Sequence, residues 1–157
     1  MSEIKTTAEA IEAAVLPDAR VAHCDPDAPK TPEELPLPTA MGEVPVEQKS
    51  PAQWAYERLV LYIQNFEKTL DGDHEIGMGF AGGEMGVMRI QGIGFFAPDI
   101  LTFYGTDMMG AKTQLVQHVG QLNVMLRAAP KESQEKEANR IGFRLAAALE
   151  NPAPEKA

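Results

Sequence analysis

The sequence has 157 residues, 44% of them apolar, with a formal net charge of −9 and a sequence pI near 4.8. A chain of this length forms at most one domain, and its acidity disfavours binding to nucleic-acid phosphates or anionic membranes. The single cysteine, Cys24, cannot form an intramolecular disulfide, which is typical of a reducing compartment. No secretion signal and no membrane-length apolar run is found, so we expect a soluble, cytoplasmic protein without nucleic-acid or membrane partners.

The N-terminal third differs from the rest in composition. Residues 1–49 hold seven of the twelve prolines, ten acidic residues against four basic ones, and no aromatic residue. Such a segment buries too little apolar surface to offset its chain entropy. We therefore predict a disordered, acidic, proline-rich tail over residues 1–49, a single folded domain over residues 50–150, and a frayed C-terminus over residues 151–157.

A helix is predicted to open the folded domain. Ser50 can cap it, Pro51 is tolerated at its first position, and Gln53 completes a capping box. The helix is expected to run to about residue 70. One broad apolar face should cover a sheet, and this face consists of Ala55, Tyr56, Leu59, Tyr62, Ile63, Phe66 and Leu70.

Residues 75–119 contain runs of Val, Ile, Phe, Tyr and Thr separated by turn residues. Consecutive strands joined by short turns pair as neighbours, so this stretch predicts a four-stranded antiparallel meander. The glycines at positions 77, 79, 92 and 94 fall on single faces of their strands. They indicate either a bulge or a packing position, or a surface that a ligand can approach closely.

The segment 120–129 is compatible with a strand or a helix, because its apolar residues fit both periodicities, and we favour a short helix. After Pro130, a closing helix is predicted over about residues 132–149. The fold class is therefore α+β: a four-stranded antiparallel meander flanked by an N-terminal and a C-terminal helix, after a disordered N-terminal tail.

Polar residues of the meander are candidates for ligand binding, namely Arg89, Tyr104, Gln114 and His118. A neutral imidazole beside amide side chains can orient a ligand or act as a general base. No Ser or Cys nucleophile lies near His118 in the sequence, so a structural role at a strand end is favoured. We expect no catalytic residue and no cofactor.

The stretch Asp71–Glu75 places acids at alternate positions, as a calcium-binding loop does. The glycine and glutamate that complete such a loop are replaced by Ile76 and Gly82. We therefore expect a helix end followed by a turn, and no metal site.

Two further sets of residues belong to the helices. A basic stripe is predicted from three residues at four-residue steps: Lys136, Arg140 and Arg144. This stripe is solvated, neutralises the acidic tail, or binds an anion. Large apolar side chains outside the sheet-facing surfaces are uncommon without a partner. The candidates for an oligomer contact on this ground are Trp54, Leu61 and Phe143. They either pack together within one chain or meet across a symmetric interface, and we favour the interface.

Three stretches of the chain together carry a family resemblance: SPAQWAYERLVLYIQNFEKTL, PDILTFYGTD and TQLVQHVGQLNVML. They resemble an uncharacterised family of small bacterial and phage-borne domains, a domain of unknown function. The resemblance covers residues 50–130 and the closing helix. It implies a bacterial or phage origin and carries over no catalytic residue.

These observations favour a non-enzymatic binding or assembly module that acts as a homo-oligomer. One alternative is a domain that sequesters or senses a small molecule, anionic or a nucleotide, through the four polar meander residues. A second alternative is a small enzyme with His118 as its general base.

Overall fold

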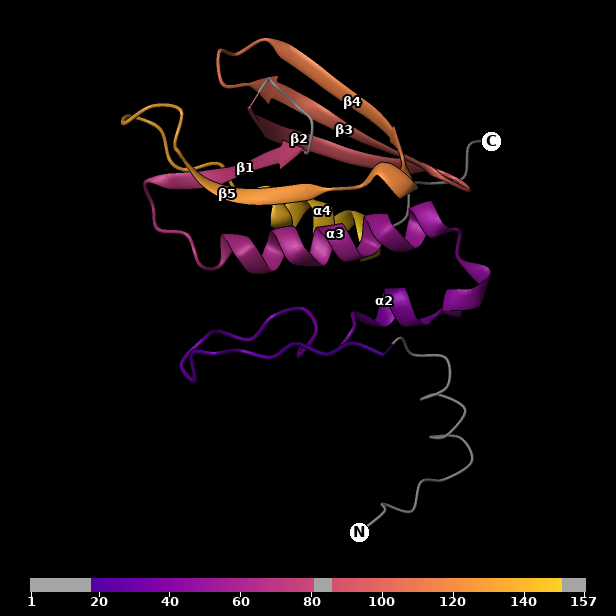
Figure 1. Ribbon diagram of the computed structural model, residues 1–157. Helices are drawn as coiled ribbons and strands as arrows, with labels where there is room; N and C mark the ends of the chain where they lie inside the picture. Colours follow the sequence, from indigo (N-terminus) through magenta and orange to yellow (C-terminus); the bar gives the residue numbers. More distant parts are fainter. Residues whose placement is uncertain (1–17, 81–85, 151–157) are drawn as a thin grey trace. The chain divides into compact units, whose positions relative to one another are not determined.

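The computed structural model describes residues 18–80 and 86–150 (Figure 1). The chain divides into two units, residues 1–49 and residues 50–157. The predicted disorder of residues 1–17 and the predicted fraying of residues 151–157 lie outside the described residues.

The described part of the first unit consists of turns, the short helix α2 (Thr39–Gly42) and the 3-10 turn η1 (Val46–Gln48). His23 Nε2 lies 2.6 Å from Glu34 Oε1, and this hydrogen bond lowers the pKa of the Glu34 carboxyl. Lys49 Nζ donates to the carbonyl of Met41 at 2.5 Å. These contacts are local within the unit.

The second unit begins with helix α3 (Pro51–Glu67), which starts where the sequence predicts. Ser50 Oγ accepts a hydrogen bond from Gln53 N at 3.1 Å. The buried side of α3 differs from the predicted face, because Val60 is fully buried and Tyr62 is 41% exposed. Helix α4 packs along α3, so the buried side of α3 faces both the sheet and a second helix.

The sheet has five strands: β1 (His74–Phe80), β2 (Val87–Phe96), β3 (Ile100–Asp107), β4 (Lys112–His118) and β5 (Val124–Pro130). Their order is β4-β3-β2-β1-β5, and all neighbouring strands are antiparallel. The four-stranded prediction was therefore one strand short, and the helix favoured for residues 120–129 was wrong. That segment forms the 3-10 turn η2 (Val119–Gln121) and then β5, which pairs with β1 over its whole length.

Side-chain alternation gives the sheet an inner face, which contacts the helices, and an outer face. The inner face carries the buried side chains Met78, Met88, Ile90, Leu101 and Phe103. Helices α3 and α4 both lie on this side (Figure 1). In the second unit, the described helices therefore leave the outer face uncovered.

A β-bulge bends β2, where the register with β3 shifts between Ile90 and Gly92. Gly105 lies opposite Ile90, and a Cβ atom built on it would be 1.9 Å from the carbonyl oxygen of Arg89. The close approach of the two backbones at the bulge therefore requires glycine at position 105.

The closing helix α4 spans Gly142–Glu150, so its predicted start at Glu132 was wrong. Tertiary contacts override helix propensity in residues 131–141. At the end of this connector, the carboxylate of Glu67 accepts hydrogen bonds from the backbone N–H groups of Ile141 and Gly142, at 2.9 and 2.6 Å. A buried side chain of α3 thus caps α4. No helix in the described ranges is long and apolar enough to cross a membrane.

Candidate functional site

Arg89, a predicted ligand-binding residue, is part of a largely buried ion pair. Its Nη1 lies 2.7 Å from Glu75 Oε2, and its Nη2 donates to the carbonyl of Pro130 at 3.0 Å. The other carboxylate oxygen of Glu75 accepts from Asn139 N at 2.9 Å. Arg89 lines a cavity of about 90 Å³, but its guanidinium binds protein groups on two sides. We call this set, residues 75, 89, 130 and 139, the closed cluster.

Tyr104 and Gln114 are the two predicted ligand-binding residues that the structure brings together. They are directly opposite one another on the outer face of β3 and β4. The Tyr104 ring fills the space beside Gly92, where a Cβ atom would be 3.7 Å from Tyr104 Cδ2. His118 lies four residues along β4 from Gln114, about 13 Å away in an extended strand. The four predicted ligand-binding residues therefore do not form one pocket.

His118 has partners at both ring nitrogens. Nδ1 accepts from Gly120 N at 2.8 Å, and Nε2 lies 3.3 Å from Asp99 Oδ2. Gln121 Oε1 accepts from His118 N at 3.0 Å, which completes a capping box at the start of η2. Because Nδ1 is the acceptor, the neutral ring carries its proton on Nε2 and has no free lone pair. This geometry suits a structural histidine better than a general base.

The predicted oligomer contacts have different surroundings. Trp54 is partly covered by the Arg58 guanidinium, which lies 4.7 Å from the ring centre, and Leu61 is partly buried. Phe143 is 78% exposed on α4. Of these three side chains, Phe143 presents the largest exposed fraction.

The predicted basic stripe is absent, because α4 starts too late to contain it. Lys136 lies in a turn, where its N–H donates to the carbonyl of Ser133. Arg140 donates to the carbonyls of His74 and Asp71, at 2.7 and 2.8 Å. Arg144 alone of the three lies on a helix.

The acidic stretch after α3 forms a turn. Asp71 Oδ1 accepts from Asp73 N at 2.9 Å and lies 2.6 Å from His74 Nδ1. The hydrogen bond with His74 is the main cause of a lowered pKa at the Asp71 carboxyl. Among the residues that the structure describes, no group of three or more His, Cys, Asp or Glu side chains is placed to hold a metal ion.

The outer face of β2, β3 and β4 carries exposed apolar side chains. Phe96 is 76% exposed, Val116 58% and Tyr104 44%. We define the outer patch as these side chains and their uncharged neighbours on the same face: Gly92, Gly94, Phe96, Ile100, Thr102, Tyr104, Gln114 and Val116. The charged residues Arg89 and Lys112 flank this set on the same face. Alternation along the strands places Val116 on the face of Gln114 and Phe96 on the face of Gly94, but it does not report how exposed each side chain is.

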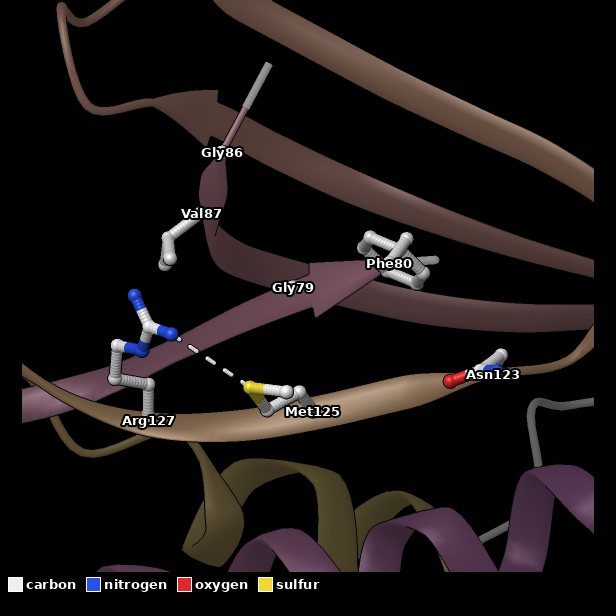
Figure 2. Close-up of a pocket in the computed structure, with 7 residues that line it drawn as sticks. All are labelled: Gly79, Phe80, Gly86, Val87, Asn123, Met125 and Arg127. Atoms are coloured by element: carbon white, nitrogen blue, oxygen red, sulfur yellow. Dashed lines mark hydrogen bonds between the residues drawn. The ribbon is translucent and has the colours of Figure 1, made fainter. Parts of the chain in front are cut away.

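A second feature is a hollow of about 250 Å³ on the outer side of β1 and β5 (Figure 2). Figure 2 shows Gly79 behind it, Val87 and Met125 on either side, and Arg127 and Asn123 toward its two ends. The full lining is Gly79, Phe80, Gly86, Val87, Asn123, Met125 and Arg127. Sequence reasoning missed this hollow because β5 was predicted to be a helix.

The described residues define a small α+β domain in which two helices cover the inner face of a five-stranded antiparallel sheet. The model of the family of unknown function DUF6173 matches residues 47–144, and the chain belongs to this family. The match spans the helices and strands of the second unit up to the start of α4. No curated protein and no solved structure shows significant similarity to the chain.

Proposed function

We propose that the domain is a non-enzymatic assembly module that forms a homo-oligomer through the outer patch. The observation that carries this proposal is the exposure of Phe96, Val116 and Tyr104 together on one uncharged stretch of sheet. Exposed apolar patches of this kind mark interaction sites. The engaged ring nitrogens of His118 support a non-enzymatic role.

Two arguments favour a second copy of the chain as the occupant. A chain with a net charge of −9 repels another copy wherever acidic surfaces meet, and the outer patch carries no charge. A two-fold symmetric interface also places the same patch on both sides. An apolar patch is complementary to itself, whereas a charged patch is not.

The test is Val116→Lys, which places a cation in the patch on each copy. The isolated monomer should tolerate the lysine, because Val116 lies on an edge strand and is 58% exposed. Burying unpaired charge in an interface should raise the dimer dissociation constant by at least about 30-fold. Sedimentation velocity from about 10 to 100 µM, with circular dichroism to check folding, measures this effect.

Phe143→Ser is the matched variant on the helical side. It should leave the association unchanged. A wild-type chain that is monomeric at about 100 µM contradicts assembly altogether. Dissociation by Phe143→Ser with Val116→Lys still associated would instead place the interface on the helices.

A further inference from the structure

The hollow beside Arg127 is kept open by a glycine that the backbone does not require. Gly79 lies opposite Met125, and a Cβ atom built on it would be 3.8 Å from Met125 Cβ, an ordinary contact distance. At Gly77 a Cβ atom would be 2.3 Å from Val87 Cγ1, so packing excludes a side chain there. Position 79 therefore has room for a side chain. Because glycine has none, the hollow stays open.

Arg127 provides a positive charge at one end of this hollow. Its Nη2 donates to Met125 Sδ at 3.7 Å, and sulfur is a weak acceptor. The guanidinium is exposed, and no carboxylate among the described residues pairs with it. A guanidinium with free donors matches the two oxygens of a carboxylate or phosphate.

The remaining walls are apolar along most of their length. Val87 and Met125 line the hollow between Arg127 and Asn123 (Figure 2). Asn123 and Arg127 are four residues apart along one extended segment, so they lie about 13 Å from each other. A volume of about 250 Å³ corresponds to roughly eight waters in the liquid, which is the size of a single ring with a short acidic substituent.

We infer that this hollow is a binding site for a small organic oxyanion with an apolar body. The carboxylate or phosphate group binds the Arg127 guanidinium, and the apolar body lies on Gly79 between Val87 and Met125. The Asn123 amide is placed for a polar substituent at the far end. This inference is independent of the proposed assembly, because the two sites share no residue: the hollow is lined from β1, β5 and the first residue of β2, and the outer patch begins at Gly92 of β2.

The experiment is an NMR titration of the whole chain with 3-phenylpropionate and phenyl phosphate, followed through the backbone amides. Two matched probes each lack one feature. Neutral 3-phenylpropanol has no charge, and inorganic phosphate has no ring. Both aromatic anions should bind with dissociation constants near 1 mM or below, and amide shifts should centre on Gly79 and Arg127. Each matched probe should bind at least about tenfold more weakly.

Two variants of the hollow and one control complete the test. Arg127→Gln should weaken both aromatic anions by at least about tenfold, because it removes the charge and keeps much of the length. Gly79→Val should abolish binding by filling the hollow, with the melting temperature retained. Arg144→Gln removes one exposed charge from α4 and should bind both anions as the wild type does.

Three outcomes would overturn the inference. The first is no binding of either aromatic anion up to about 10 mM. The second is unchanged binding in Gly79→Val, or a loss in Arg144→Gln equal to that in Arg127→Gln. The third is inorganic phosphate binding as tightly as phenyl phosphate, which would show that the apolar walls contribute nothing.

Discussion

Arg89 and Arg127 project from the same outer face of one sheet, and their surroundings are opposite. Arg89 is nearly buried, with a carboxylate and a carbonyl as its partners, and it ties β2 to Glu75 of β1 and to Pro130 at the end of β5. Arg127 is exposed beside a hollow, with a thioether as its neighbour. A cation that the protein has paired contributes to the fold, whereas a cation left beside an empty apolar space is available to a ligand.

The largest effect should come from breaking the closed cluster. Glu75→Ala leaves the Arg89 charge largely buried without a carboxylate and Asn139 N–H without an acceptor. The free energy of unfolding should fall by about 3–5 kcal/mol, measured by urea denaturation. Arg127→Ala should change it by less than about 0.5 kcal/mol, because no carboxylate among the described residues pairs with that charge. Equal losses in the two variants would remove the contrast between the arginines.

Removing Glu67 should lower the free energy of unfolding by a smaller amount, because its buried carboxylate binds backbone amides and not a cation. Glu67→Ala leaves the N–H groups of Ile141 and Gly142 without their acceptors at the start of α4. This change should cost about 2 kcal/mol, and Glu67→Gln, which keeps one acceptor oxygen, should cost less. Hydrogen exchange at these two amides reports the cap directly. Unchanged protection in Glu67→Ala would show that Glu67 does not hold the helix start.

The smallest effect should come from the exposed contact between Asp71 and His74. The pKa of Asp71 is lowered in the folded chain, chiefly by the hydrogen bond with His74. A carboxyl with a depressed folded pKa stabilises the fold above its unfolded pKa, near 3.9, and loses that contribution as the pH falls through the folded pKa. Asp71→Asn should therefore lower the melting temperature slightly at pH 7, and the difference should shrink as the pH falls below about 3.9. A difference independent of pH would assign the effect to the turn and not to the charge.

The features predicted correctly from the sequence are those that depend on residues close together in the chain. Turn residues between β-rich runs correctly separated β1, β2, β3 and β4, and Ser50 with Pro51 correctly marked the start of α3. The start of α4 was missed because residues 132–141 are rich in helix-forming side chains. Their backbone is held by Glu75 and Glu67, which are more than sixty residues away in the chain.

The hollow could not be predicted, because it needs the pairing of β5 with β1. Asn123, Met125 and Arg127 share a face only if this segment is a strand, and Gly79 lies opposite Met125 only in the observed register. The glycines at positions 77 and 79 were the available signal, and they indicated close approach without showing what approaches. A pairing between segments nearly fifty residues apart leaves no local pattern.

The link between β4 and β5 has a geometric consequence. Residues 119–123 connect the two edge strands of the sheet. In a flat sheet of five strands the edges lie about 19 Å apart, while a link containing a 3-10 turn reaches about 16 Å. The sheet must therefore curve so that the end of β4 and the start of β5 approach each other, as they do in Figure 1. The length of this link, and not only the side chains of the core, sets the curvature around α3.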